Sequence, residues 1–534
     1  MLPFITLDGL AFRARDGRTL FEDLTLAFGG ERTGLVGANG CGKTTLLRLI
    51  LGELAPAAGA VTTRGRIGFL RQSLAPPPGA SLADLLGASE DLARLDRIDR
   101  GEGTEADLAD ADWSLPARLG AALAEVGLAA FDPSRSAASL SGGEATRARL
   151  AGLLIARPDM ILLDEPTNNL DAEARSAVRR VLAGWSGGAL VVTHDRALLR
   201  AMDRIVEISG LGPRVYGSGY DLYAQRREEE AGAAQRDLEN AAREAKRVER
   251  EVQATRERQD RRDAAGVRAK ARGDQPRIVL GAMGARAEQT RGGQNRLADR
   301  KRADVQATLE TARARTERLR KLEFALPSSG LAAGKLVLAI EDVAFAWPGS
   351  TPLMSGLNIR LLGPRRLAVT GANGAGKTTL MRLAAGELAP TEGRITRGAA
   401  AVMLDQRAAL LRDDQSLMEN YRRLNPAADD NAAHAALARF LFRNVSALKL
   451  AGDLSGGERL RAALACVLMA PRPPQLIVLD EPTNHLDLAS IEAIESALAA
   501  YDGALLVVSH DEDFLAAVGV DATLRLAAPD DRPL

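Results

Sequence analysis

The chain carries one series of short motifs twice, in the same order, and this duplication constrains its fold more than any other feature. The matched pairs are GANGCGKTT at 37–45 and GANGAGKTT at 371–379, LSGGE at 140–144 and at 454–458, LLDEPTNNLD at 162–171 and VLDEPTNHLD at 478–487, and VVTHD at 191–195 and VVSHD at 507–511. Self-similarity over a long period indicates a repeated structural unit. The sequence therefore predicts two copies of one domain.

The two copies differ in length at one place. Gln72 and Gln406 keep the same distance from their glycine-rich segments, but LSGGE follows about 20 residues later in the first copy. The surplus falls near 85–112, a polar and acidic stretch. Surface connections tolerate such additions, so we expect residues 85–112 to form an insertion at the surface. We favour a loop without a function there over an arm that contacts a partner.

The segment between the copies, 224–334, matches neither of them. Both of its ends are rich in Ala, Glu, Arg and Gln, which are strong helix formers, and no proline interrupts them. Its centre contains glycines and one proline, which break helices. This pattern predicts two long helices that form an antiparallel hairpin.

Positive charge gathers at the tip of this predicted hairpin. Residues 261–302 include about twelve basic and four acidic side chains, a net charge of about +8, whereas the whole chain has a formal net charge of zero. Lys and Arg gain affinity for a phosphate backbone by releasing counterions. Arginine outnumbers lysine there and can stack on bases, and the tip has no Phe, Tyr or Trp. We expect a nucleic-acid contact, and a solvated basic surface is the alternative.

Composition excludes several other classes of protein. The two cysteines, Cys41 and Cys466, are too far apart for a zinc motif and too few for a disulfide framework. No run of ~18–20 apolar residues could form a membrane helix. The N-terminus lacks the basic and apolar pattern of a signal peptide. We therefore expect a cytoplasmic protein with no membrane-spanning part.

Both glycine-rich segments fit the phosphate-binding pattern G-x-x-x-x-G-K-[ST], and each lies between a predicted strand and a leucine-rich predicted helix. Glycines let backbone N–H groups converge on phosphate oxygens, and the helix that follows presents its positive end. Lys43 and Lys377 would reach the β- and γ-phosphates, and Thr44 and Thr378 would bind magnesium. The full predicted set is Gly37, Asn39, Gly40, Gly42, Lys43, Thr44 and Thr45, and Gly371, Asn373, Gly374, Gly376, Lys377, Thr378 and Thr379.

Two apolar predicted strands each end in a pair of carboxylates. Asp164 and Asp480 lie where an aspartate associated with magnesium is needed. Glu165 and Glu481 follow them and can polarise the attacking water as general bases. His194 and His510 end the next apolar strand at equivalent places in both copies, which favours a contact with the γ-phosphate. The alternative is that each Asp–Glu pair is only a solvent-exposed acidic pair at the end of a strand, but this would not explain why DEPTN follows an apolar run twice.

LSGGE is the most diagnostic motif, because Ser141 and Gly143, or Ser455 and Gly457, open a predicted helix that can bind an anion. With these motifs the chain resembles the ATP-binding-cassette family, in which LSGGE of one cassette caps the ATP held by the other. The resemblance implies ATP and Mg²⁺ as ligands and two complete hydrolysing sites. Site one would combine Lys43, Glu165 and His194 with Ser455, and site two would combine Lys377, Glu481 and His510 with Ser141. Gln72 and Gln406 match glutamines that lie near magnesium in the family.

The family usually stacks an aromatic side chain on adenine shortly before the phosphate loop. In the second copy Trp347 fits this place, although a core aromatic would look the same in sequence. In the first copy the alignment puts Arg15 there, with Phe12 nearby. An arginine can stack on a base.

Two cassettes, no membrane domain and a charged helical linker resemble the ABC-F branch of the family, over essentially the whole chain. The resemblance implies two P-loop NTPase domains, 1–223 and 335–534, joined by a helical hairpin whose tip reaches tRNA and rRNA on the ribosome. It implies a translation factor or an antibiotic-resistance ribosomal protection protein, acting as a monomer whose two cassettes pair within one chain, with no obligate protein partner. One departure is Asn169, where the family commonly has the His found at 485; we expect it to alter communication across site one.

Three alternatives differ in class. An ATPase subunit of a transporter would work with a separate membrane protein, but such fused cassettes rarely carry a basic hairpin. A DNA-associated ATPase would need longer coiled coils or a DNA-binding tail. A scaffold without activity would not need Glu165 and Glu481 in both copies.

Overall fold

The computed structural model describes residues 3–71, 76–209, 212–217, 219–270, 299–313, 316, 326–405 and 407–527. The chain divides into two compact units. One comprises Met1–Tyr220 and Leu322–Leu534 and holds both copies of the repeat, and the other comprises Asp221–Lys321. The predicted α/β fold with two cassettes is confirmed.

The larger sheet of the first cassette has the strand order β5-β6-β7-β3-β8-β9. Its strands are β3 (Arg32–Val36), β5 (Ile67–Leu70), β6 (Met160–Asp164), β7 (Gly188–Val192), β8 (Arg204–Ser209) and β9 (Gly212–Tyr216), parallel except for β9. Every residue of β6 and β7 is buried. Continuous apolar runs of this length are typical of parallel strands covered on both faces.

A smaller antiparallel sheet has the order β2-β1-β4, from β1 (Ile5–Arg13), β2 (Thr19–Phe28) and β4 (Ala58–Thr63). Leu7 of β1, Leu162 of β6 and Leu46 of helix α1 (Lys43–Ile50) belong to one apolar core. This core fixes α1, and with it the glycine-rich loop, between the two sheets.

The second cassette repeats this plan. Its larger sheet has the order β14-β15-β16-β12-β17 and its smaller sheet the order β11-β10-β13. The strands are β10 (Leu336–Phe345), β11 (Met354–Leu362), β12 (Arg366–Thr370), β13 (Glu392–Arg397), β14 (Ala401–Leu404), β15 (Leu476–Asp480), β16 (Ala504–Val508) and β17 (Ala522–Arg525).

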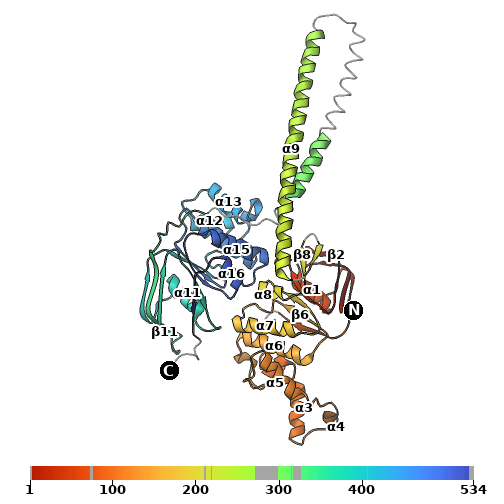
Figure 1. The fold of residues 1–534 in the computed structure, drawn as a ribbon, viewed down its shortest axis with the longest axis vertical. Helices are drawn as coiled ribbons and strands as arrows, with labels where there is room; N and C mark the ends of the chain where they lie inside the picture. The colour runs from red at the N-terminus through yellow and green to blue at the C-terminus, as the bar shows by residue number, and fades with distance from the viewer. Residues whose placement is uncertain are drawn as a thin grey trace. The chain divides into compact units, whose positions relative to one another are not determined.

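The other cassette helices lie beside these sheets (Figure 1). They are α5 (Leu115–Glu125), α6 (Gly142–Ala156), α7 (Ala172–Gly184) and α8 (Arg196–Arg200) in the first cassette, and α11 (Lys377–Ala385), α12 (Leu417–Leu424), α13 (Asp430–Arg439), α14 (Gly456–Leu468), α15 (Leu488–Ala500) and α16 (Glu512–Ala517) in the second. Tyr421 of α12, Leu437 of α13 and Leu464 of α14 share one core.

The insertion near 85–112 is helical rather than a simple loop. It contains the end of α2 (Leu82–Leu86), then α3 (Ser89–Asp99) and α4 (Glu105–Ala109). Asp107 is 9% exposed and accepts a hydrogen bond from Arg97 at 2.6 Å, which ties α4 to α3. Acidic residues in this stretch therefore build local structure and do not only solvate it.

The second unit contains all but the first residue of α9 (Tyr220–Lys270), a single helix of 51 residues, and a helix over 299–313 beside it (Figure 1). Arg302 donates to Glu249 at 2.7 Å, and Thr316 Oγ1 donates to the carbonyl of Ala234 at 3.0 Å. Ala234 precedes Glu249 along the chain, whereas their partners occur in the reverse order, Thr316 after Arg302. The two segments therefore run antiparallel, as in a helical hairpin. Residues 271–298, most of the basic tip, lie outside the described residues. Among the described helices, none is long and apolar enough to span a membrane.

Candidate nucleotide sites

The strand order brings the separate motifs to one edge of each sheet. β7 lies between β6 and β3, and all three are parallel, so their carboxyl ends meet. The glycine-rich loop follows β3, Glu165 follows β6 and His194 follows β7. Ligands bind at this edge in open α/β sheets. The second cassette has the same arrangement through β12, β15 and β16.

The loop conformation requires glycine. Gly42 has φ 103°, and a Cβ there would lie 2.7 Å from the Phe21 ring. Lys43 begins α1 and donates from Nζ to the carbonyl of Gly37 at 2.7 Å. Lys377 makes the matching bond to Gly371 at 2.7 Å. Each ammonium is therefore held over its own loop, where a phosphate would meet it.

The residues predicted to bind magnesium fit that ion. Burial raises the pKa of Asp164 and of Asp480, and the side chains of Thr44 and Thr378 oppose that shift by favouring the charged carboxylates. Asp164 is 3% exposed, and its Oδ1 has no hydrogen-bond partner among the described residues. Mg²⁺ takes few protein ligands and completes its shell with waters and substrate phosphates, so one hydroxyl and one carboxylate suit it. Gln72 and Gln406, predicted nearby, lie outside the described residues.

Glu165 and Glu481 share an uncommon backbone conformation, with φ 48° in both. Burial raises the pKa of Glu165 to about 8, although the positive charge of Lys43 in the same cassette acts to lower it. Burial raises the pKa of Glu481 to about 7, and the largest opposing charge is Arg175 of the other cassette. Carboxyl groups with a pKa near the working pH suit proton transfer.

His194 and His510 contact these glutamates. Nε2 of His194 lies 3.5 Å from Oε1 of Glu165, and Nε2 of His510 lies 3.4 Å from Oε1 of Glu481. Burial and the nearby lysine lower the pKa of His194 to about 3 and that of His510 to about 4, so both rings are neutral at neutral pH. A neutral ring can donate one hydrogen bond to a phosphate oxygen.

Each phosphate loop also contacts the opposite cassette. In site two, Asn373 donates from its backbone N to Asp171 at 3.3 Å and from Nδ2 to the carbonyl of Asn169 at 3.2 Å. In site one, Asn39 makes the same bonds to Asp487 at 2.8 Å and to the carbonyl of His485 at 2.8 Å. Asp171 and Asp487 are not among the residues predicted from the sequence, although each ends a motif that occurs twice.

The expected effect of Asn169 on communication across site one stays a prediction. Asn169 itself contacts the phosphate loop of site two. Its carbonyl makes this contact, as the carbonyl of His485 does in site one, and both residues have positive φ, 58° and 61°. Since a backbone atom makes the contact, replacing His by Asn preserves it.

The LSGGE segments begin helices through a capping box. Ser141 accepts from the N–H of Glu144 at 3.2 Å, and Glu144 accepts from the N–H of Ser141 at 2.6 Å. Ser455 and Glu458 form the same box in α14. A Cβ on Gly143 would lie 3.9 Å from Asn373 Nδ2, so this segment adjoins the phosphate loop of site two.

Site two contains a cavity of about 440 Å³. It is lined by Asn169 and Leu170 of the first cassette and by Trp347, Leu353, Asn373, Gly374, Gly376, Lys377, Thr378, Thr379, Asp480, Glu481, Asn484 and His510 of the second. The structure thus brings most of the predicted site-two residues around one space; Ser141 is not part of its lining. Trp347 is 44% exposed and packs edge-on against Phe345 at 5.1 Å, so it is not a core aromatic.

The first cassette places a different residue at its phosphate loop. Arg15 lies exposed in the turn after β1, whereas Arg18 donates from Nη2 to the carbonyl of Gly40 at 3.0 Å. Arg18 is not among the residues predicted from the sequence. Its place in the turn between β1 and β2 is the sequence feature that could have indicated Arg18.

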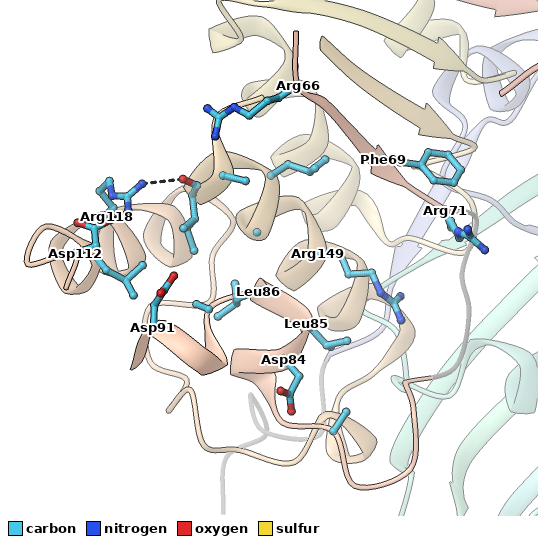
Figure 2. Close-up of a pocket in the computed structure, with 18 of the residues that line it drawn as sticks. Arg66, Phe69, Arg71, Asp84, Leu85, Leu86, Asp91, Asp112, Arg118 and Arg149 are labelled. Carbon is cyan, nitrogen blue, oxygen red and sulfur yellow. Dashed lines mark hydrogen bonds and ion pairs between the residues drawn. The ribbon is translucent and has the colours of Figure 1, made fainter. Parts of the chain in front are cut away.

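A separate cavity of about 910 Å³ lies in the first cassette, between β5, α2, α5 and α6 (Figure 2). Its walls include Leu85, Leu86 and Arg149, and Arg118 is held there by Asp112. No residue of the phosphate loop lines it. This cavity is therefore not the nucleotide site.

Two arginines of α8 join the cassettes. Arg196 forms a buried pair with Glu495, at 2.6 and 2.9 Å. Arg200 pairs with Asp513 at 2.8 and 2.9 Å. Both arginines also lie over the ring of Tyr220, the first residue of α9.

Comparison with known proteins agrees with this geometry. Residues 23–168 and 354–484 match a family model described as ABC transporter. The tylosin resistance ATP-binding protein TlrC of Streptomyces fradiae is 33% identical over 549 residues, which covers 95% of this chain and 94% of that protein. The ATP-binding protein Uup of Haemophilus influenzae is 32% identical over 512 residues, 90% of this chain and 72% of that protein.

Solved structures show the same fold. One titled RNase-L Inhibitor has a TM-score of 0.54 and 19% identity and covers 97% of this chain and 87% of its own. An archaeal ABCE1, solved with a ribosomal stalk protein, has a TM-score of 0.55 and 18% identity, with the same coverage. Together with the duplicated motifs and the paired sites, these findings show that the chain is an ATPase of the ATP-binding-cassette family and belongs to its ABC-F branch.

Proposed function

We propose that this ATPase binds the ribosome in an ATP-closed form, acts there on translation or protects the ribosome from an antibiotic, and leaves after hydrolysis. The observation that carries the proposal is the helical hairpin between the cassettes, with a net charge of about +8 in 261–302. Such a tip suits the phosphate backbone of rRNA or tRNA. The similarity to a relative named for tylosin resistance, along nearly all of its length, supports the same class of function.

The proposed chemistry at each site uses residues of both cassettes. Glu165 or Glu481 accepts a proton from water while the water oxygen bonds to the γ-phosphorus and the bond to the β–γ bridging oxygen breaks; the proton then passes to the released phosphate. Lys43 or Lys377 and the neutral histidine hold the γ-phosphate in place. Mg²⁺, bound by Thr44 and Asp164 or by Thr378 and Asp480, would supply positive charge to the phosphates.

The cassette contacts explain how ATP would control closure. Asn39 and Asn373 each lie in a phosphate loop and each hold the opposite cassette by two hydrogen bonds. ATP between the loop and the opposite LSGGE would add a further bridge, and loss of the γ-phosphate would remove it. Because one chain supplies both halves of both sites, we propose that it acts as a monomer.

Co-sedimentation with ribosomes at near-physiological salt tests the proposal. The Glu165→Gln, Glu481→Gln double variant should bind ATP, stay closed and pellet with ribosomes only when ATP is present. If this variant hydrolyses ATP at the wild-type rate, the assignment of the bases is wrong.

Charge variants then test the tip. Changing Arg261, Arg262, Arg268 and Lys270 to Gln should reduce pelleting, because these side chains fall in the basic region. A matched control changes Arg236, Arg243, Arg247 and Arg250 to Gln within α9, outside that region, and should keep most of the binding. No pelleting at any salt would overturn the ribosomal proposal and leave the ATPase assignment standing. Recovery with membranes, or activity stimulated by duplex DNA, would then indicate the alternative classes.

A further inference from the structure

One arginine of the first cassette reaches the nucleotide site of the second. Nη2 of Arg175, on α7, lies 3.5 Å from Oδ1 of Asn484, which lines the cavity of site two. The backbone N–H of Asn484 donates to the carbonyl of Glu481 at 3.3 Å. Arg175 therefore contacts the short turn that carries the proposed base of site two.

The same guanidinium is anchored within its own cassette. Its Nε donates to the carbonyl of Leu170 at 3.1 Å, and Leu170 lines the same cavity. Its Nη1 lies 3.7 Å from Oδ2 of Asp195, the residue after His194 of site one. The side chain of Arg175 is only 11% exposed. Arg175 thus lies between the histidine segment of site one and the base segment of site two.

The second cassette has no arginine at the matching position. α7 and α15 both have 13 residues and begin after a capping aspartate, Asp171 and Asp487. Arg175 is the fourth residue of α7, and Ile491 is the fourth of α15. Ile491 is 2% exposed and belongs to the apolar core of the second cassette. The two sites, alike in their motifs, therefore differ in this charge.

We propose that Arg175 is a positioning residue that acts in trans: hydrolysis at site two depends on it, and hydrolysis at site one does not. It holds the segment of Asn484 against the first cassette and places a permanent positive charge beside site two, because a guanidinium stays protonated. Through Asp195 it also links site two to the histidine segment of site one. The inference rests on the proposed assignment of Glu481 as the base of site two.

Single-site backgrounds separate the two sites. In Glu165→Gln protein, where only site two keeps its base, adding Arg175→Ala should lower kcat roughly 10- to 100-fold, as small misplacements at a reacting centre do, with little change in KM. In Glu481→Gln protein the same substitution should change kcat less than twofold. Arg175→Lys should recover part of the loss and Arg175→Met should not, because only lysine keeps the charge.

Hydrogen–deuterium exchange of the nucleotide-free protein gives a readout that does not need turnover. Arg175→Ala should speed exchange in the peptide 481–486 and leave the peptide 37–45 unchanged. The matched control is Arg180→Ala, on the same helix, whose bonds go to Ser176 and to the carbonyl of Glu125 in its own cassette. It should change neither readout.

Three results for Arg175→Ala would overturn the proposed role of Arg175. They are an equal loss of kcat in both backgrounds, no loss of kcat in either background, and unchanged hydrogen–deuterium exchange in the peptide 481–486. If the activity of the Glu481→Gln background is too low to measure, the exchange comparison decides. Wild-type turnover by the Glu165→Gln, Glu481→Gln double variant would instead refute the proposed bases, and that result is distinguishable because it does not involve Arg175.

Discussion

At the scale of single residues, each site is built on a carboxyl that is costly to bury while charged. Glu165 follows a fully buried strand, contacts a neutral histidine at 3.5 Å and has a strained φ of 48°. Strain and a displaced pKa commonly occur together at functional sites. The sequence motif identifies this glutamate, but its electrostatic environment depends on the residues packed around it.

Burial of Glu165 should make stability depend on pH. Its pKa is raised from 4.5 to about 8 on folding. At pH 4 the carboxyl is protonated in both states, and as pH rises from about 4.5 to 8 the unfolded state ionises first, so the folded state loses stability in this window. Glu165→Gln removes that loss, on the order of 4 kcal/mol by pH 8.

Thermal melts between pH 5 and 8, without nucleotide or magnesium, test this. The gain in Tm of Glu165→Gln over the wild type should grow with pH and level off above pH 8. Glu173→Gln is the control, since the side chain of Glu173 is 77% exposed. A gain that is the same at every pH would contradict the burial of the Glu165 carboxyl.

Trp347 should contribute to nucleotide binding at site two only. It is partly exposed and lines the cavity beside Lys377. Stacking on a base contributes about 1–3 kcal/mol, so Trp347→Ala should weaken binding of an ATP analogue at this site about tenfold or more. Titrations with a fluorescent analogue measure it. Trp113→Ala, at a side chain that is 61% exposed and away from that cavity, should leave both sites unchanged, and equal losses for the two variants would exclude stacking.

At the scale of elements, the LSGGE motif has a structural role as well as the proposed nucleotide role. Its serine and glutamate form a capping box that starts α6 and α14. The same box, with Ser416 and Glu419, starts α12, where no nucleotide motif occurs. The serine and the glutamate of each LSGGE therefore also serve to start a helix in this chain.

The α12 box provides a matched control for the nucleotide role. Ser141→Ala and Ser416→Ala should each lower the free energy of unfolding by about 1 kcal/mol, because each removes one cap. Only Ser141→Ala should also reduce ATP hydrolysis. Chemical denaturation and steady-state ATPase assays on both variants measure the two effects. Equal ATPase activities would mean that Ser141 acts only as a cap.

At the scale of the whole molecule, the two cassettes are joined by polar contacts between residues distant in sequence. Arg196 and Glu495 are 6% and 9% exposed and hold each other at two points. Arg200 and Asp513 form a similar pair, but their side chains are 40% and 30% exposed. The two pairs differ mainly in burial, so they make a natural comparison.

A double-mutant cycle should separate these pairs. Arg196→Met alone leaves a buried carboxylate without its partner and should cost about 3–5 kcal/mol, whereas Arg196→Met with Glu495→Met should recover most of that loss. Arg200→Met should cost about 1 kcal/mol or less. Denaturant unfolding of the wild type, Arg196→Met, Glu495→Met and the double variant measures the coupling. Additive effects at Arg196 and Glu495 would mean that the buried contact does not form in solution.

The sequence by itself determined the local structures: which apolar runs become buried strands, and where a glycine-rich segment joins a strand to a helix. These follow from short-range sterics and burial, which a stretch of ten residues already encodes. It also indicated the helical nature of the linker, although it favoured a loop at 85–112, where the structure has helices.

Only the tertiary structure decided which side chains and carbonyls hold each phosphate loop to the opposite cassette, because those contacts join residues hundreds of positions apart. Asn39 meets Asp487, Asn169 lies at site two, and Arg175 reaches Asn484 through the relative placement of two folded domains. No local pattern marks Arg175, since it occurs once and the repeat has isoleucine in its place. The asymmetry of two sites with equal motifs therefore appears only when the domains are placed side by side.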